Sequence, residues 1–159
     1  MNVNTTLPTH SHPRFLPLAS GYAVGFLSPA AIPLWVGALR ALHGLTAPQA
    51  GMIASLELGA VALGAVLTGI LAPSRDRPTA IIPVFALNGL ANLATILVPS
   101  VVLLTLVRIL CGLSAGYVMA IATRAAARQT DPRRAFAFQQ FGFVALSVVF
   151  FLAVSTLML

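Results

Sequence analysis

The sequence has little charge of either sign. Only 8% of its 159 residues are charged, the basic ones are all arginines, and the acids are Glu57, Asp76 and Asp131. Soluble domains carry about 25% charged residues, because even a buried soluble helix needs a charged surface somewhere. Hydrophobic residues make up 58% of the chain, and its mean hydropathy is +0.96. This composition excludes an ordinary soluble domain and indicates an integral membrane protein whose first partner is the lipid bilayer.

Cysteine and histidine are also scarce. The one cysteine, Cys111, can form no internal disulfide, and its apolar surroundings say nothing about the redox compartment. His10 and His12 lie in the polar segment 1–13, which we expect to be a disordered cytoplasmic tail. Two histidines in such a tail are more often exposed to solvent than bound to a metal. The sequence therefore predicts no metal site and no cofactor.

Five apolar segments each approach the roughly 20 residues that a helix needs to cross a bilayer. The segments are 15–39, 47–72, 79–98, 101–123 and 135–159. The first is longer than the roughly 7–15 apolar residues of a signal peptide, so we expect it to stay, kinked at Pro29 and Pro33. Thr46 is a candidate N-cap for the second, with Pro48 in its first turn. We predict an all-α transmembrane domain over 14–159.

The arginines predict the orientation of this domain. With a cytoplasmic N-terminus, the inner ends hold seven arginines and the outer turns hold only Arg40. The seven are Arg14, Arg75, Arg77, Arg124, Arg128, Arg133 and Arg134. Positive residues concentrate on the cytoplasmic side of membrane proteins. We therefore interpret the net charge of +6 as a topology signal in a cell inner (plasma) membrane, and not as a nucleic-acid surface.

Two charges lie inside the predicted spans. Glu57 is about ten residues into the second span, and Arg108 is about seven into the fourth. At 1.5 Å per residue, both lie roughly 10–15 Å below the outer surface. Charged side chains within a membrane are costly and usually face a cavity or a partner. We expect the two to pair or to share one polar cavity, either as a structural ion pair or as a site for binding or proton coupling.

The stretch GLSAG, residues 112–116, fits the G-x-S-x-G pattern of a serine hydrolase. That site needs a strand before it and a nearby histidine, whereas Ser114 follows an apolar helix pattern and no span contains a histidine. We therefore predict that the protein is not an enzyme. Gly112 and Gly116 are four residues apart, a spacing that lets helices approach closely, and Gly59 and Gly64 suggest the same for the second span.

Several polar side chains remain inside the spans. Asn88 and Asn92 are expected to hydrogen-bond to a neighbouring helix. Tyr22 and Tyr117 are the best aromatic hydroxyl candidates to line a lumen, although such tyrosines serve equally often as packing or interface residues. Gln139 and Gln140 lie at the start of the last span, near its cytoplasmic side.

The order of these features resembles the N-terminal half of a major facilitator superfamily transporter. LTAPQAGMIASLELGAVALGAVLTG (45–69) is similar to the family's second helix, and RILCGLSAG (108–116) to its fourth-helix R-x-x-x-G-x-x-x-G motif. GILAPSRDRP (69–78) lies where the family has the loop motif G-x-L-A-D-R-x-G-R-R, with Pro73 in place of the acid. TDPRRAFAFQQFGF (130–143) resembles the basic loop into the fifth helix.

The resemblance implies secondary active transport of a small organic solute by alternating access. Arg108 would be a substrate or proton-coupling residue in a central cavity, and Gly69, Arg75, Asp76 and Arg77 would form a cytoplasmic gate loop. Family members have two six-helix halves around a midplane site, whereas five helices are predicted here. The sixth helix and the second half would come from a missing C-terminal half or another copy. The alternative is a non-transporting small membrane protein that binds partner helices.

Overall fold

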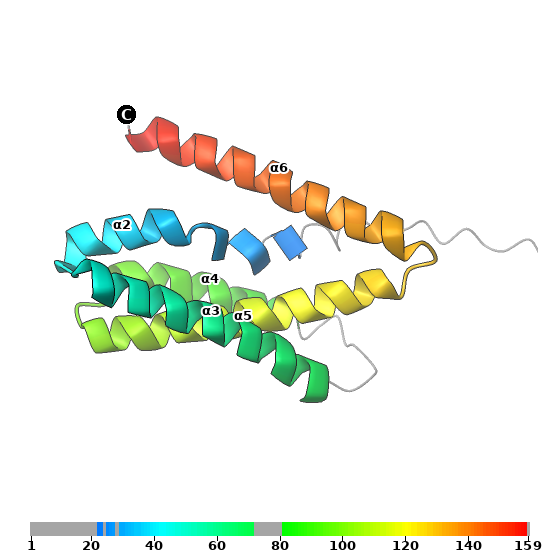
Figure 1. Cartoon of the computed structure of the whole chain (residues 1–159), viewed down its shortest axis with the longest axis horizontal. Helices are drawn as coiled ribbons and strands as arrows, with labels where there is room; N and C mark the ends of the chain where they lie inside the picture. Colours follow the sequence, from blue (N-terminus) through cyan, green and yellow to red (C-terminus); the bar gives the residue numbers. More distant parts are fainter. Residues whose placement is uncertain (1–21, 24, 28, 72–80, 159) are drawn as a thin grey trace, which may run out of the picture.

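The computed structural model describes residues 22–23, 25–27, 29–71 and 81–158, and the regular structure in these ranges is all α-helical (Figure 1). The helices are α2 (Ile32–His43), α3 (Ala47–Leu71), α4 (Ile81–Leu97), α5 (Val101–Ala127) and α6 (Pro132–Met158). The predicted all-α class is therefore confirmed. The expected tail 1–13 and the loop 72–80 lie outside the described residues.

Among the described residues, three helices are long and apolar enough to cross a membrane: Ala47–Leu71, Val101–Ala127 and Pro132–Thr156. The apolar helix Ile82–Leu97 is shorter. Large apolar side chains cover their outer surfaces; Ile70 is 74% exposed and Leu97 is 81% exposed. A soluble monomer rarely exposes apolar patches of more than about 300–600 Å². The helices and their surface are therefore those expected of a membrane protein.

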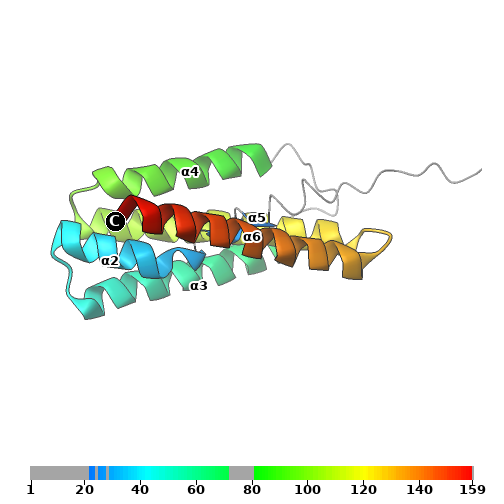
Figure 2. The same cartoon turned by 90° about the horizontal axis from the view of Figure 1, so that it is seen from above.

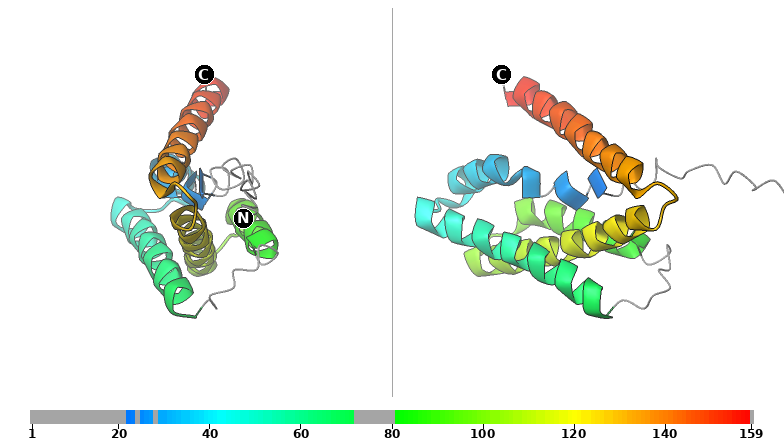
Figure 3. Two further views of the ribbon diagram at one scale, coloured as in Figure 1. Left: turned by 90° about the vertical axis from the view of Figure 1, so that its right-hand side faces the viewer. Right: turned by 45° about the vertical axis from the view of Figure 1, so that its right-hand side comes forward.

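Helix α5 is the centre of the arrangement. Viewed along the bundle, it lies between α3 on one side and α4 on the other (Figure 3, left), and the view from above shows the same order (Figure 2). Helix α3 packs along α5 more extensively than any other pair of described helices. Leaving the end of α5, α6 diverges from the bundle toward the C-terminus (Figure 1). The α3–α5 pair is therefore the most extensively packed part of the described structure, and α2, α4 and α6 each pack against one of its two helices.

Small residues explain why α3 and α5 approach so closely. A Cβ atom on any of three glycines would collide with a main-chain oxygen of the facing helix, and main chain cannot move aside. Gly64 lies against the carbonyl of Leu113, Gly112 against that of Glu57, and Gly116 against that of Val61. The predicted packing role of Gly64, Gly112 and Gly116 is therefore confirmed.

Gly59 makes no such contact with another described helix. Nothing within the described residues lies within 4 Å of a Cβ built there, and Gly59 is on the exposed face of α3. Gly59, Gly64 and Gly69 are five residues apart, and five residues turn about 140° around a helix of 3.6 residues per turn. The three glycines therefore cannot share a face, and only Gly64 points at α5.

The first predicted span is interrupted, as its prolines indicate. A helical segment ends in a turn at Ala31, and α2 then begins with Pro33 in its first turn. Pro33 has no N–H to donate to the preceding turn, which breaks the helix there. Beyond the predicted boundary at residue 39, α2 continues to His43 and ends at Gly44, whose φ of 63° is the left-handed conformation that glycine adopts readily.

Side chains set three other helix ends. Thr46 and Gln49 cap α3 reciprocally: the Gln49 amide donates to Thr46 Oγ1 at 3.5 Å, and the Thr46 amide donates to Gln49 Oε1 at 2.9 Å. The predicted N-cap is therefore confirmed. Asp131 Oδ1 accepts from the Arg134 amide at 3.1 Å and starts α6 three residues before the predicted boundary. Helix α5 continues past residue 123, and Arg124 Nη2 donates to the carbonyl of Thr68 at 2.5 Å near the end of α3.

Candidate functional site

Arg108 and Glu57 form an ion pair in the middle of the α3–α5 interface. Arg108 donates from Nε to Glu57 Oε2 at 2.9 Å, and from Nη2 to Oε1 at 2.7 Å and to Oε2 at 2.6 Å. The side chains are 2% and 0% exposed. Paired donors of one guanidinium on one carboxylate give a directional interaction that a lysine could not reproduce. The predicted pairing of these two residues is confirmed.

Two further helices complete the surroundings of the guanidinium. From Nη1, Arg108 donates to Asn92 Oδ1 on α4 at 3.2 Å. The Trp35 ring on α2 lies over the guanidinium carbon, 3.9 Å from the ring centroid, which is a cation–π contact. Each of the four helices α2 to α5 thus supplies one side chain to the site.

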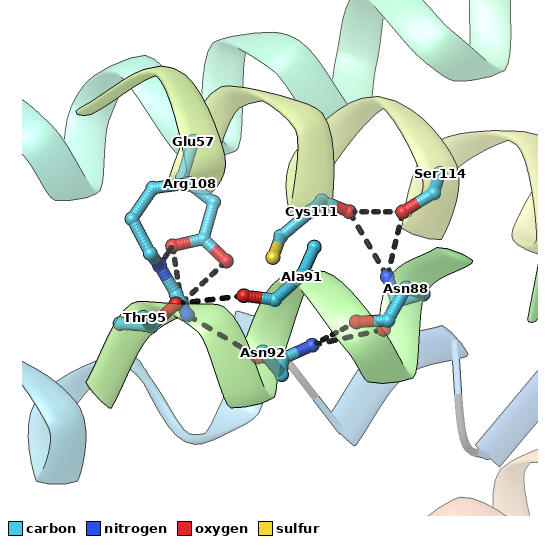
Figure 4. A network of polar contacts seen from close by, with 8 residues as sticks. All are labelled: Glu57, Asn88, Ala91, Asn92, Thr95, Arg108, Cys111 and Ser114. Atoms are coloured by element: carbon cyan, nitrogen blue, oxygen red, sulfur yellow. Dashed lines mark hydrogen bonds and ion pairs between the residues drawn. The ribbon is translucent and has the colours of Figure 1, made fainter. Parts of the chain in front are cut away.

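A chain of hydrogen bonds runs from this pair along α4 (Figure 4). Asn92 Nδ2 donates to Asn88 Oδ1 at 3.0 Å and to the Asn88 carbonyl at 2.9 Å. In turn, Asn88 Nδ2 donates to Ser114 Oγ at 2.8 Å and to the Cys111 carbonyl at 3.1 Å on α5. The predicted helix-to-helix hydrogen bonds of Asn88 and Asn92 are confirmed, and the two residues connect Arg108 to Ser114 through side chains alone.

The Ser114 hydroxyl is hydrogen-bonded within and between helices. Its hydroxyl accepts from Asn88 and donates to the Cys111 carbonyl at 2.9 Å. The helix continues unbroken through this position, from Val101 to Ala127, so the strained turn of a nucleophile elbow is not present at Ser114. His43, the histidine that the structure describes, is in the last turn of α2. The hydroxyl thus links α4 to α5.

An apolar cluster lies between the ion pair and one end of the bundle. Leu104 is one turn before Arg108 on α5, and Ile53 is one turn before Glu57 on α3. Both belong to a buried cluster with partly buried Trp35, Val36 and Val98 packed against it. The buried members are Leu39, Leu45, Ala50, Ile53 and Leu104. The cluster lies at the α2–α3 and α4–α5 turns, on the left of Figure 1.

A small cavity lies at the Asn88 end of the polar chain. Beside Asn88 there is a cavity of about 10 Å³, lined by Gly25, Phe85, Asn88, Ala115 and Val118. This volume holds about one water molecule, whereas pockets for small organic ligands measure about 300–1,000 Å³. This cavity is too small for an organic solute, and the Arg108 and Glu57 side chains are almost completely buried, so a solute would reach the pair only if the helices separated.

The two tyrosines lie away from the pair. Tyr22 Oη accepts from Gln140 Nε2 on α6 at 3.2 Å, and its ring packs on Phe26 with centroids 5.0 Å apart. Tyr117 is nine residues beyond Arg108 on α5, a spacing that turns it about 180° to the opposite face. The structure thus brings Glu57 and Arg108 together, and it does not bring Tyr22 or Tyr117 to them.

Gly69 is the one residue of the expected gate loop that lies within the described ranges. Gly69 is on the exposed face of α3, and a Cβ there would meet nothing within 4 Å in the described part of the chain. Arg75, Asp76 and Arg77 lie outside the described residues. Asp131, the other loop acid, caps α6.

Sequence reasoning missed two residues at the site. Trp35 is the only tryptophan of the chain, but no periodicity relates its position on α2 to Arg108 on α5. Gly25 packs against α5, where a Cβ would lie 3.3 Å from Val118 Cγ1. A lone glycine and a lone tryptophan carry no spacing signal, so only the rotation of the helices about their axes reveals these contacts.

Comparison with protein-family models, with curated proteins and with solved structures finds no match to this chain.

Proposed function

We propose that the chain is a helical domain of a secondary transporter for a small organic solute, and that Arg108 and Glu57 couple solute or proton binding to movement. The observation that carries the proposal is the burial of this pair among membrane-type helices. Replacing a buried pair by apolar side chains is often neutral or stabilising, so its presence is weak evidence of a purely structural role.

The geometry supports exchange at the pair. Arg108 directs four of its five N–H groups to Glu57 and Asn92, so it can hold an anionic solute with paired donors only by giving up a donor that one of these residues now holds. A proton on Glu57 would remove the charge that holds Arg108 and release the guanidinium. Neutralisation of the carboxylate and binding of an anion thus favour the same separated state of the two side chains.

The proposal extends to the family and the assembly. We infer from the sequence motifs that the chain is the N-terminal portion of a major facilitator superfamily transporter in the inner membrane, with the N-terminus in the cytoplasm. Alternating access requires two units that move against each other. We therefore expect transport only when a complementary half, or another copy of this chain, completes the assembly.

Flux into lipid vesicles tests this function. Vesicles would hold the chain alone, or the chain with a complementary half, and would be loaded with a pH-sensitive dye. Benzenesulfonate, betaine and ethidium would serve as anionic, zwitterionic and cationic probes; the sulfonate stays ionised and carries no proton across the bilayer by itself. We expect a solute-dependent pH change only from the complete assembly, and its loss in the Glu57→Gln/Arg108→Gln double variant. Unchanged flux in a folded double variant would refute the role of the pair.

A second function has its own supporting observation. Only 6% of the residues in the most apolar stretch of α6 are buried, and α6 diverges from the bundle (Figure 1). A groove of about 410 Å³ runs between Ala30 and α6, with almost wholly apolar walls that include Phe143, Val144, Val148, Phe151 and Leu152. A non-transporting protein that binds partner helices would use such a face. Absence of flux in every assembly, together with a stable complex through α6, would favour this alternative.

A further inference from the structure

Trp35 covers a part of Arg108 that no hydrogen bond uses. The guanidinium directs its N–H groups in its own plane, to Glu57 and Asn92. Its carbon lies 3.9 Å from the centroid of the Trp35 ring, and Arg108 as a whole is only 2% exposed. An aromatic face attracts a cation by its ring quadrupole and excludes water at the same time. Trp35 therefore completes the enclosure of the pair from the side of α2.

Helix α2, which carries Trp35, is a short element between two breaks. On one side is the turn at Ala31, followed by Pro33; on the other is Gly44 in the left-handed conformation. Element ends of this kind absorb the backbone rotations of hinge motions, while the helix between them stays rigid. A displacement of α2 would therefore carry Trp35 and Leu39 away from the bundle without breaking α3 or α5.

The closed position leaves one polar group of Trp35 without a partner. The indole Nε1 is buried and finds no hydrogen-bond acceptor among the described residues. A buried donor without an acceptor loses the hydrogen bond that water would give it. Displacement of α2 toward water would restore that bond, so the enclosure is held by the cation–π contact and apolar packing, and is opposed by the indole N–H.

The side that would open is determined by the position of the apolar cluster. Leu39, Leu45 and Leu104 lie between the ion pair and the end of the bundle that holds the α2–α3 and α4–α5 turns. Trp35 packs against this same cluster. Removal of Trp35 and Leu39 would therefore open a path to the pair from that end, while the glycine contacts would still close the α3–α5 interface.

We propose that Trp35 is a positioning residue and a lid: it holds the Arg108 guanidinium against Glu57, and movement of α2 about Ala31 and Gly44 exposes the pair at the end of the α2–α3 turn. The exchange of a ligand at the opened pair rests on the function proposed above. The enclosure itself does not, and its test measures access instead of transport.

The protein contains its own reporter of access. Cys111 is the only cysteine, is fully buried, and is one turn beyond Arg108 on α5. Figure 4 shows its sulfur on the side where Glu57 and Arg108 lie, between α4 and α5. A small charged methanethiosulfonate, sulfonatoethyl methanethiosulfonate, does not cross the bilayer. Its rate of reaction with Cys111, applied to either face of sealed membranes, measures the opening of the site on that face.

The Trp35→Ala variant tests the lid. The labelling rate follows the fraction of time that the site is open, so we expect a rise of about tenfold or more from the α2–α3 side and none from the other. Trp35→Phe keeps a ring over the guanidinium and should stay near the wild-type rate. Trp35→Leu keeps apolar bulk without a quadrupole and should be intermediate. Leu42→Ala, on the same helix but 68% exposed, is the matched control and should change nothing.

Two further variants make the result decisive. Cys111→Ser must abolish labelling, and Ser100→Cys in that background identifies the face on which the α4–α5 turn lies. One-sided acceleration in Trp35→Ala, or in Trp35→Leu if the alanine variant does not fold, supports the lid. Unchanged rates in both variants, or equal acceleration from both faces, would overturn it. Absence of flux from every assembly, together with one-sided acceleration of labelling in Trp35→Ala, would count against the transport proposal and leave the lid standing.

Discussion

Arg108 Nη2 and Glu57 Oε2 are 2.6 Å apart in the interface between α5 and α3, and both side chains are almost completely buried. Four residues beyond Arg108, Gly112 rests on the Glu57 main-chain oxygen. The contact that brings the two backbones together and the contact that neutralises the charges therefore involve the same turns of the two helices. A substitution at Gly112 should therefore disturb the Arg108–Glu57 ion pair, and loss of the ion pair should weaken the backbone contact at Gly112.

Removal of one charge should be worse than removal of both. Glu57→Gln or Arg108→Gln alone leaves an uncompensated buried charge, which costs about 3–5 kcal/mol. The double variant should recover most of that loss, and thermal unfolding of purified protein in detergent would measure it. Equal stability of all four proteins would mean that the pair is solvated. If the double variant recovers folding but not transport, the pair does more than hold helices together.

The glycines of the α3–α5 interface should tolerate no side chain. In Gly112→Ala or Gly116→Ala the new methyl meets main chain of α3, so the helices must separate, at a cost of about 1–3 kcal/mol. Gly59→Ala is the matched control: it adds the same methyl on the open face of α3 and should be neutral or stabilise the helix by up to about 1 kcal/mol. A destabilised Gly59→Ala protein would show that a further helix covers that face.

Asn88 should contribute more to stability than Ser114, its hydrogen-bond partner on α5. Asn88→Ala removes both bonds that cross from α4 to α5, to Ser114 Oγ and to the Cys111 carbonyl, whereas Ser114→Ala removes one of these and a bond within α5. Side-chain hydrogen bonds between membrane helices contribute about 0.6 kcal/mol on average and up to about 1.7. We expect a loss in the upper part of that range for Asn88→Ala and a smaller one for Ser114→Ala. The reverse order in unfolding experiments would contradict the assigned contacts.

Ser114 should be unreactive toward a fluorophosphonate probe of serine hydrolases. Its hydroxyl hydrogen is committed to the Cys111 carbonyl, and no described histidine is available to remove it. Mass spectrometry of the treated protein would show no adduct in native membranes. A covalent adduct at this residue, lost in Ser114→Ala, would revive the hydrolase interpretation of GLSAG.

The two ends of the bundle should lie on opposite sides of the membrane. Arg124, Arg128, Arg133 and Arg134 lie around the α5–α6 turn, whereas Arg40 is in the last turn of α2 at the other end. Arg133 and Arg134 begin α6, where the helix dipole disfavours cations, so they serve orientation better than stability. In the Cys111→Ser background, Thr130→Cys should react only from the cytoplasm and Ser100→Cys only from outside.

The reverse pattern of labelling would show that the N-terminus is not cytoplasmic. Both marker positions are exposed, and Ser100 makes no side-chain capping bond that a cysteine would remove. A difference in labelling would therefore report topology and not local unfolding.

Much of this protein could be predicted because a membrane leaves few choices. Low charge and long apolar runs required helices, since every backbone polar group must be satisfied within its own segment. The prolines predicted the break before α2, Thr46 predicted the start of α3, and two opposite charges at one depth predicted the pair. Each of these signals is local or depends only on distance along a helix.

What could not be predicted depends on rotation about the helix axes and on side-chain contacts between distant segments. Gly59 and Gly64 looked equivalent in the sequence, but only Gly64 faces α5. Tyr22 and Tyr117 were equal candidates to line a lumen, but Tyr22 contacts Gln140 on α6 and Tyr117 is on the face of α5 opposite Arg108. Apolar periodicity is of little use for this rotation, because a helix in lipid is apolar on its packed and its exposed faces.

The sequence by itself therefore determined the helical class, the three long apolar helices and the pairing of Glu57 with Arg108, because bilayer thickness and the cost of buried charge constrain these directly. Only the tertiary structure decided that Trp35 and Asn92 enclose that pair, that Gly64 interlocks with α5, and that α6 diverges from the bundle. Those outcomes depend on which helix faces meet, and close packing between distant segments selects them.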